Sequence, residues 1–405
     1  MTSHKTKDSF CIRPFTHADI VTSGKIRVCC EIKPELTKFR GQSKFNVKDG
    51  FNKFWTSDYR QYLMQSFLQN KKPKECQECW QRESKNLESE RISGNRKMKY
   101  LFKANHEAHL KKLNLWNITS PQDMTFAITN LCNLKCQMCK GMFSSTLLSE
   151  NKKLGFETNI SQKDFDWDKG TKINFIENVI QHDLENMTIL GGEPFIVPEI
   201  YKILQALSKK PKITERLDLT LFTNGTTCNK KMLDTLKKFK KLQLIISMDS
   251  TYKNSDYMRY PSNWLNIKKN IDTFKKMPFV KLSINATVQN LNIFYIDNLI
   301  EYAYKNQLHL NLSPISEPTY LQFNNLPLSI LEKSLEKLTN IEIEKTIHVT
   351  NYKDIVEELK RLVDKKQQPD HIQFRKFTSM IRARDQYRKI SIKNYMPELA
   401  KEILR

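Results

Sequence analysis

The segment TNLCNLKCQMC, residues 129–139, places three cysteines in a C-x3-C-x2-C pattern directly after an apolar stretch typical of a strand. Three thiolates on one short loop hold three irons of a [4Fe–4S] cube and leave the fourth iron without a protein ligand. An open coordination position of this kind is what substrate chelation requires. A structural zinc ion would need a fourth ligand nearby, yet the next cysteine is Cys228 and no histidine follows at finger-like spacing. The pattern favours an open iron–sulfur cluster on Cys132, Cys136 and Cys139.

Strand-like and helical segments alternate on both sides of this loop, between residues 119 and 325. The strand-like segments are Met124–Asn130, Met187–Leu190, Leu217–Phe222, Leu242–Met248, Val280–Val288 and Leu308–Leu312. Amphipathic helical segments between them include Ile200–Lys209, Lys230–Phe239, Trp264–Lys276 and Ile296–Lys305. Six βα repeats predict an α/β fold with a parallel sheet and helices outside it. Because eight repeats close a full barrel, six predict an open, partial (β/α)6 barrel with its functional groups at the carboxyl ends of the strands.

The barrel is predicted to lie between a small N-terminal domain and a C-terminal helical region. Residues 1–95 predict an α+β, cysteine-rich domain with a hairpin over Ile20–Cys30 and a helix over Phe51–Gln69. The charged stretch Arg82–Lys99 resembles a linker, and we place the linker proper at residues 96–118. Within the barrel, Glu157–Lys172 is expected to be a loop insertion. Residues 326–405 are expected to form packing helices, for example Tyr352–Val363, Phe374–Arg388 and Pro397–Leu404.

Composition restricts the class of protein. The 405 residues contain no apolar run long enough to span a membrane, and no apolar segment follows the basic N-terminus as in a secretory signal. We therefore expect a cytoplasmic protein without membrane association. Nine cysteines, an odd number, favour metal or redox chemistry over a disulfide framework. The net charge of +23 suits either a polyanionic partner or a lysine-rich solvated surface.

The cysteine triplet at the end of the first barrel strand resembles that of the radical S-adenosylmethionine (SAM) superfamily. This resemblance implies that the open iron chelates the amino and carboxylate groups of SAM. It also implies that one electron from the cluster breaks the C5′–S bond, and that the resulting 5′-deoxyadenosyl radical takes a hydrogen atom from a substrate. Met138 stands where the family usually has an aromatic residue against the adenine edge, and methionine is able to pack there as well.

Two further strand ends carry residues that the resemblance assigns to SAM. The sequence Gly191-Gly192-Glu193-Pro194 resembles the family's motif for the SAM amino group, with two glycines that allow close approach of a ligand. Ser247 and Asp249 end another strand, where the family contacts the ribose hydroxyls or the carboxylate. Arg259 suits bidentate contact with the SAM carboxylate, although a surface position is equally compatible. Thr223-Asn224-Gly225 resembles the family's TNG turn, and a purely structural turn is an equal alternative.

A second group of cysteines lies near the N-terminus. Four thiols from separated segments, Cys11, Cys29, Cys76 and Cys79, would close a metal site, and their spacing suits zinc and [4Fe–4S] alike. Cys30 is an alternative to Cys29. Because strand residues alternate between faces, Cys30 should pack with Ile26 and Val28, which leaves Cys29 as the ligand. The group resembles the SPASM/twitch auxiliary-cluster domain, which usually follows the barrel rather than preceding it.

The resemblance predicts a radical SAM enzyme with a flavodoxin- or ferredoxin-type reductant, acting on a peptide or protein side chain. One alternative is a radical SAM enzyme that acts on RNA, a nucleotide or a sugar, which the positive charge suggests. Another is a non-enzymatic protein that binds a metal cluster. No general acid or base is assigned from the sequence, and Cys228 is expected to be a free thiol.

Overall fold

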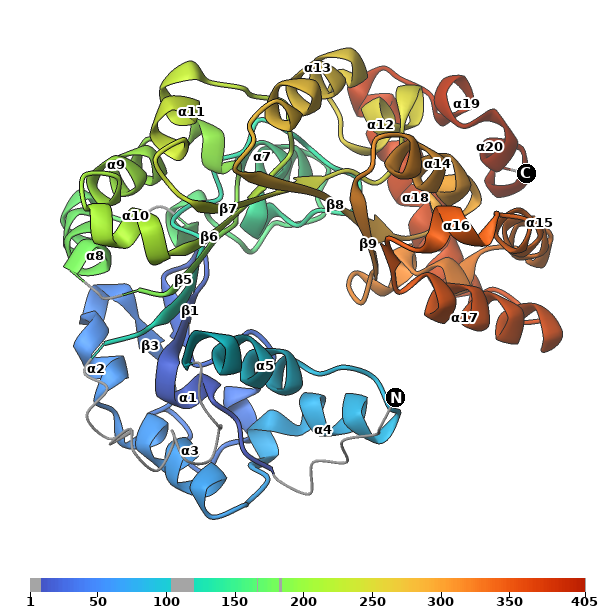
Figure 1. Ribbon diagram of the computed structural model, residues 1–405. Helices are drawn as coiled ribbons and strands as arrows, with labels where there is room; N and C mark the ends of the chain where they lie inside the picture. The colour runs from blue at the N-terminus through green and yellow to red at the C-terminus, as the bar shows by residue number, and fades with distance from the viewer. Residues whose placement is uncertain (1–8, 103–119, 166, 182–183, 405) are drawn as a thin grey trace.

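The computed structural model describes residues 9–102, 120–165, 167–181 and 184–404 (Figure 1). Within these residues the strands form one ten-stranded sheet in the order β10-β9-β8-β7-β6-β5-β4-β1-β2-β3. The strands are β1 (His17–Ile20), β2 (Lys25–Arg27), β3 (Phe45–Asn46), β4 (Asp123–Phe126), β5 (Asn186–Ile189), β6 (Asp218–Thr223), β7 (Lys241–Ser247), β8 (Val280–Val288), β9 (His309–Pro314) and β10 (Val349–Thr350). Every neighbouring pair from β10 to β1 is parallel, whereas β2 and β3 are antiparallel.

The six predicted barrel strands correspond to β4 through β9, and their order along the chain is their order in the sheet. The sheet is open, with β10 at one edge and β3 at the other, which confirms an open α/β architecture. The short strand β10 and the N-terminal strand β1 were not predicted as sheet neighbours of this unit. The period-two burial of β6 and β7 explains their formation, since every second side chain enters the core.

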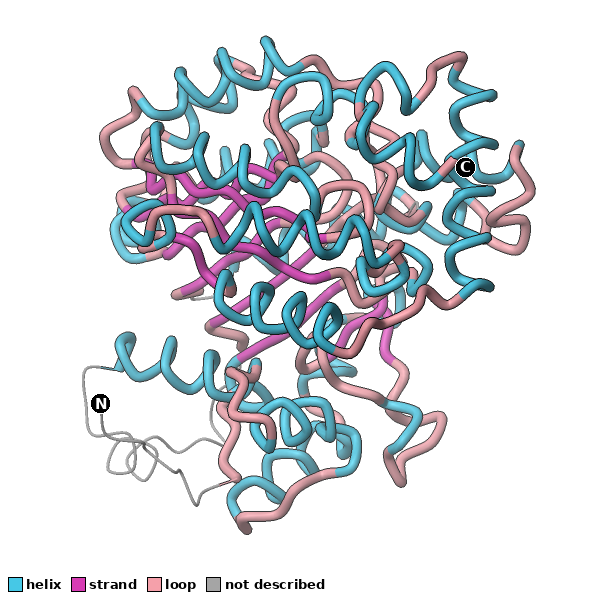
Figure 2. Tube along the Cα trace, turned by 90° about the vertical axis from the view of Figure 1, so that its right-hand side faces the viewer, coloured by secondary structure: helices cyan, strands magenta, loops and turns pink. Residues whose placement is uncertain are grey.

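Helices connect the parallel strands and lie outside the sheet (Figures 1 and 2). They are α7 (Ser145–Lys153), α8 (Lys169–Gln181), α9 (Pro198–Leu207), α10 (Pro211–Arg216), α11 (Lys230–Leu236), α12 (Tyr252–Met258), α13 (Trp264–Lys275) and α14 (Ile296–Lys305). Each of α9, α13 and α14 buries one apolar face, as its sequence period indicates. The expected loop insertion Glu157–Lys172 was partly wrong, because α8 begins at Lys169.

The N-terminal region is attached to the barrel by main-chain pairing. Strand β1 lies parallel to β4, and Ala18 and Ile20 pair with Met124 and Phe126. The region also contains α1 (Arg13–Thr16), α2 (Phe51–Trp55), α3 (Asp58–Leu68), α4 (Gln77–Ser84) and α5 (Glu90–Phe102). The single predicted helix is thus two, α2 and α3, because Ser57 caps the second one. The two cysteine-bearing regions therefore share one sheet.

The predicted linker over Arg82–Lys99 was wrong, since α4 and α5 occupy most of it. Its charges are used within the fold: Arg91 pairs with Glu83 at 2.7 Å and donates to the carbonyl oxygen of Phe10 at 2.8 Å. Arg13 likewise pairs with Glu90 at 2.6 Å. The part of the proposed linker between residues 103 and 118 lies outside the described residues.

The C-terminal region is helical, as expected. It contains α15 (Leu328–Thr339), α16 (Ile343–Thr346), α17 (Tyr352–Asp364), α18 (His371–Arg388), α19 (Ile392–Tyr395) and α20 (Pro397–Ile403). The longest of these, α18, crosses toward the carboxyl end of the sheet. Among the helices that the structure describes, none combines the length and the apolar character needed to cross a membrane.

The first prediction concerns Arg60, a buried side chain that joins the N-terminal helices. Its guanidinium donates to the carbonyl oxygens of Pro14, Phe15 and Trp55 at 2.7, 3.1 and 2.6 Å. Arg60→Met leaves these buried acceptors unpaired, so we expect the free energy of unfolding to fall by about 2–4 kcal/mol. Urea denaturation followed by circular dichroism measures this change. Lys53→Met, at an exposed site on α2, is the matched control; an equal loss in both variants contradicts the prediction.

Candidate functional site

The cysteine triplet lies on the loop that follows β4. Cys132 and Cys136 are buried and Cys139 is half-buried. Burial and then the neighbouring Cys136 thiol raise the pKa of Cys132 to about 12. Burial and then Cys136 and Cys132 raise the pKa of Cys139. Burial also raises the pKa of Cys136, so all three thiols stay protonated at neutral pH until a metal displaces the proton.

The Gly191–Pro194 turn packs directly against this loop. The backbone N–H of Glu193 donates to the carbonyl oxygen of Leu131 at 2.8 Å. Gly191 and Gly192 have φ values of +80° and +54°, and a Cβ on Gly192 would lie 2.2 Å from the Leu131 carbonyl oxygen. We expected the glycines to admit a ligand, but in the structure the close neighbour of Gly192 is the cysteine loop and that of Gly191 is Ala127.

The Glu193 carboxylate is completely buried and joins two strand ends. One oxygen accepts from the backbone N–H of Phe195 at 3.1 Å and from the Thr223 hydroxyl at 2.7 Å. The other accepts from the backbone N–H of Asn224 at 2.6 Å. Burial raises the pKa of Glu193, while these hydrogen bonds oppose the shift. Since a carboxylate has roughly four acceptor sites, one more donor can be accommodated.

The TNG turn contacts the cysteine loop through Asn224. Its side-chain amide donates to the side-chain oxygen of Asn133 at 2.9 Å and approaches the Cys132 sulfur at 4.0 Å. The turn thus contacts other residues of the site. Its sequence alone did not decide between a site turn and a purely structural one. Asn133 is a contact that the sequence did not single out.

Asp249 and Arg259 form a buried ion pair beside Cys136. Arg259 Nε lies 2.8 Å from a carboxylate oxygen of Asp249, and Arg259 Nη1 lies 3.9 Å from the Cys136 sulfur. The other Asp249 oxygen accepts from the backbone N–H of Thr287 at 2.7 Å. The surface position considered for Arg259 is excluded, because the side chain is buried. Ser247, the last residue of β7, lies two residues before Asp249 and is half-buried.

Helix α18 contributes contacts that no sequence motif predicts. Arg384 donates to the carbonyl oxygen of Gln137 at 2.7 Å, and Arg388 donates to that of Lys135 at 2.7 Å. Both acceptors lie within the cysteine loop, next to Cys136 and Met138. Arg388 also holds the buried carboxylate of Glu150 at 2.6 Å.

The four predicted N-terminal ligands surround one cavity, which Cys11, Cys29, Cys76 and Cys79 line together. Burial raises the pKa of Cys11 to about 12 and that of Cys79 to about 11. The pKa of Cys29 is lowered, mainly by a hydrogen bond with the Cys30 thiol.

Cys30 is exposed and does not line this cavity. We expected strand alternation to bury Cys30 beside Val28, and that expectation was wrong. Strand β2 ends at Arg27, so the alternation stops before the two cysteines, and it is Cys29 that turns toward the cavity.

Both cysteine sets have the donor chemistry of iron–sulfur ligands. In the described part of the chain, no three His, Cys, Asp or Glu side chains are grouped as ligands of one metal ion. A four-iron cluster has a different requirement, because each thiolate binds its own iron at the periphery of a cube. Thiols spread around a cavity, or along one loop, fit that requirement.

The two sites lie at opposite ends of the parallel strands β1 and β4. The cysteine loop follows the carboxyl end of β4, whereas Cys11 precedes β1, which runs parallel to β4. Cys29 follows β2, and because β2 is antiparallel to β1 it too lies beside the amino end of β1. At about 3.3 Å per residue, the four paired residues of these strands alone separate their two ends by about 13 Å.

Comparison with known proteins agrees with this geometry. Residues 126–303 match the family model described as the radical SAM superfamily. This stretch is a radical SAM domain. It begins in β4 and ends in α14, and thus includes the cysteine loop, the Gly191–Pro194 turn and the Asp249–Arg259 pair.

The curated relatives fall in two groups. GTP 3′,8-cyclase of Clostridium acetobutylicum is 25% identical over 201 residues, which are 48% of this chain and 57% of that protein. The antilisterial bacteriocin subtilosin biosynthesis protein AlbA of Bacillus subtilis is 33% identical over 131 residues, 32% of this chain and 25% of that protein. The chain thus spans between a quarter and just over half of the length of the curated relatives it matches.

Among solved structures, SuiB of Streptococcus suis aligns with a TM-score of 0.41 and 17% identity, over 82% of this chain and 69% of that one. Native anSMEcpe with bound AdoMet aligns with a TM-score of 0.39 and 17% identity, over 52% and 57% of the two chains.

The second prediction concerns the contact between α18 and the radical SAM loop. Arg388→Met leaves the buried Glu150 carboxylate without its closest cation, so we expect the free energy of unfolding to fall by about 3–5 kcal/mol. The loss of its bond to Lys135 should also lower the iron bound after anaerobic reconstitution. Urea denaturation and iron counting measure the two effects.

Two further variants test the cause. Arg382→Met, on the exposed face of the same helix, should change neither quantity. Glu150→Met together with Arg388→Met should recover part of the stability, because the carboxylate that Arg388 neutralised is then absent too, while Arg384 keeps its hydrogen bonds to Gln137 and Asn151. A double variant that is less stable than Arg388→Met would contradict the proposed cause.

Proposed function

We propose that this chain is a radical SAM enzyme with two [4Fe–4S] clusters that acts on a peptide or protein side chain. The observation that carries the proposal is the grouping of Cys132, Cys136 and Cys139 on one loop inside the matched domain, held by the ends of the second, third and fourth barrel strands. When bound, the cluster supplies the electron that cleaves the C5′–S bond of SAM.

The remaining site residues bind and orient SAM. Glu193 accepts a hydrogen bond from the SAM amino group with its remaining acceptor site, on the turn shaped by Gly191, Gly192 and Pro194. Arg259 binds the SAM carboxylate, because a guanidinium has five N–H donors and the contacts with Asp249 and Cys136 use only two of them.

Two side chains complete the nucleoside side of the pocket. Ser247 contacts a ribose hydroxyl from the end of β7, and Met138, which is nearly buried beside Cys139, packs against the adenine edge. Asp249 orients Arg259, to which it is paired, and adds an acceptor close to the ribose. No side chain is assigned as a general acid or base.

The N-terminal cavity holds the second cluster through Cys11, Cys29, Cys76 and Cys79. Four thiols around one cavity support a fully ligated site, and the exposure of Cys30 supports Cys29 as the fourth ligand. A fully ligated cluster has no open iron, so its chemistry is confined to electron transfer or structure.

The peptide substrate is supported by the 33% identity to a bacteriocin biosynthesis protein. A nucleotide is the second candidate, favoured by the GTP 3′,8-cyclase relatives and by the net charge of +23. Adding GTP to the SAM-cleavage assay separates the two. A GTP-derived product would contradict the peptide proposal, whereas an unchanged rate of 5′-deoxyadenosine formation favours it.

The third prediction tests both clusters. After anaerobic reconstitution, the wild-type protein should contain about eight irons and produce 5′-deoxyadenosine with dithionite and SAM. The Cys132→Ala/Cys136→Ala/Cys139→Ala variant should contain about four irons and produce none. Replacing Cys11, Cys29, Cys76 and Cys79 by alanine should also leave about four irons, with SAM cleavage by dithionite retained.

Cys228→Ala is the control, since Cys228 lies outside both groups, and it should match the wild type. Zinc in place of iron at both sites, with no 5′-deoxyadenosine from any protein, would defeat the enzyme proposal and leave a metal-binding protein without this activity.

A further inference from the structure

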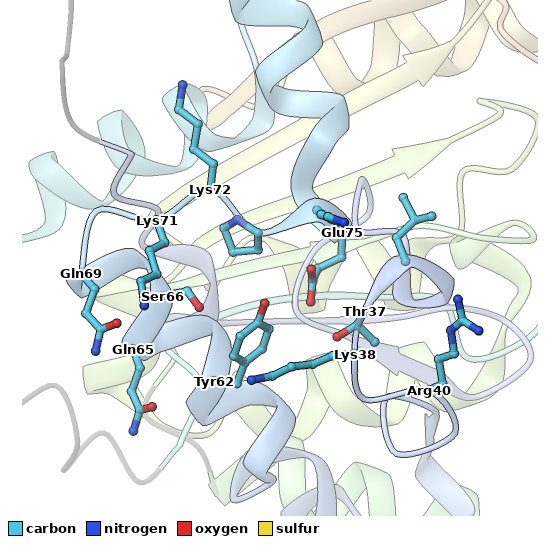
Figure 3. A pocket seen from close by; sticks show the side chains of 13 residues that line it. Thr37, Lys38, Arg40, Tyr62, Gln65, Ser66, Gln69, Lys71, Lys72 and Glu75 are labelled. Carbon is cyan, nitrogen blue, oxygen red and sulfur yellow. The ribbon is translucent and has the colours of Figure 1, made fainter.

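A group of cations surrounds a pocket of about 580 Å³ on the N-terminal region. We define this basic rim as Lys38, Arg40, Lys71, Lys72 and Lys74, all of which are exposed. Figure 3 shows Lys71 and Lys72 on one side of the pocket and Arg40 on the other, with Tyr62 and Glu75 between them. The rim comes from two separate chain segments, before α3 and after it.

Within the described part of the chain, no carboxylate forms an ion pair with any of the five rim cations. Nearby Lys33, in contrast, pairs with Glu78 at 2.9 Å. Two rim cations rest on aromatic rings instead: the ammonium of Lys38 lies 4.5 Å from the centre of Tyr62, and that of Lys72 lies 5.1 Å from the centre of Trp80. Five cations around the one carboxylate of Glu75 leave a net positive charge, and the resulting potential attracts an anionic partner.

The pocket and the N-terminal cysteine cavity are separated by a thin wall. Glu75 lines the pocket while the next residue, Cys76, lines the cavity. Ser66 and Phe67 divide in the same way. Trp80, on which Lys72 rests, also lines the cavity. A molecule bound at the rim would therefore lie one layer of side chains from the four thiols.

The pocket is unsuited to a small anion such as phosphate. The buried carboxylate of Glu75, 1% exposed, lines it between the rim cations and would repel an anion that enters. All five cations are exposed, and Lys72 points away from the centre of the pocket (Figure 3). A macromolecule with spread acidic groups fits this arrangement better.

We propose that the basic rim docks an acidic electron-transfer protein of the flavodoxin or ferredoxin type, which reduces the cluster at the N-terminal cavity. The inference rests on the proposed function, because it needs a cluster there. The carrier loses one electron and the N-terminal cluster gains it, and no covalent bond forms or breaks. An acidic peptide substrate is disfavoured at this surface, since the four cysteines beside it lie at the amino ends of the strands, opposite the radical SAM loop at the carboxyl ends.

The fourth prediction uses charge reversal on the rim. The variant Lys38→Glu/Lys71→Glu/Lys74→Glu keeps Lys72 on Trp80 and lowers the net charge by six units. The control Lys353→Glu/Lys360→Glu/Lys365→Glu makes the same change in net charge at exposed sites on or next to α17. Both charge-reversal variants are made in the wild type and in the Cys132→Ala/Cys136→Ala/Cys139→Ala background. In that background the N-terminal cluster is the one left to absorb light.

The probe is an acidic flavodoxin in its fully reduced form. Calorimetry gives its Kd, and stopped-flow absorbance gives the rate at which the cluster bleaches. We expect the rim variant to weaken binding and slow bleaching about tenfold or more at low salt, with the control within about twofold of the parent. Raising the ionic strength should slow the parent toward the rim variant, because salt screens exposed charges. Bleaching by dithionite should be equal in all of them.

The possible failures are distinguishable. If dithionite bleaches no N-terminal cluster in the parent, or iron is missing there, both the cluster and the docking role are overturned. If dithionite bleaches the cluster normally but the rim variant binds and is reduced by flavodoxin like the control, docking alone is overturned. Loss of salt-sensitive RNA binding in the rim variant, with unchanged flavodoxin kinetics, would also overturn it and assign the surface to nucleic acid.

Discussion

The burial of three thiols on one short loop is the constraint on which the candidate site depends. A loop of this length has little stabilising structure of its own, so the positions of its three thiols depend on the residues around it. The fold meets this need from the surrounding strand ends: Gly192 meets the backbone at Leu131, Asn224 reaches Cys132, and Arg259 reaches Cys136. The loop is thus positioned by residues of three different strand ends rather than by its own sequence.

The charged side chains around the loop also come from other parts of the fold. Arg259 is neutralised by Asp249, so this pair adds hydrogen-bonding capacity near Cys136 without net charge. Lys135, Arg384 and Arg388, in contrast, share the single buried carboxylate of Glu150 at 3.5, 3.9 and 2.6 Å, and the two arginines come from α18. This group therefore holds more cations than anions. A thiolate-ligated cluster is anionic, and an unpaired buried charge is costly. The C-terminal helix, which no motif marks, supplies that compensation.

The sequence predicted what depends on local pattern and missed what depends on distant contact. Strand β8 and helix α14 have the predicted bounds, because their periodicity reflects burial on one face. Arg384 contacts a residue 247 positions earlier, which no spacing rule encodes. The charges of Arg82–Lys99 suggested a solvated linker, but polar side chains also build helices when partners such as Glu83 lie nearby. The prediction that Cys30 is buried was wrong for a simpler reason. Side chains alternate between the two faces only where a strand continues, and β2 ends at Arg27.

The parallel pairing of β1 with β4 carries the broadest consequence for function. It builds the N-terminal region into the barrel sheet and places its four cysteines at the amino ends of the strands, while Cys132 and its neighbours lie at the carboxyl ends. A second cluster at the amino ends is too distant to be a ligand for a substrate held at the carboxyl ends. The basic rim beside it is open to a partner. The position of the N-terminal site, its four thiols around one cavity and the surface charge beside it together favour an electron-transfer role over a substrate-binding one.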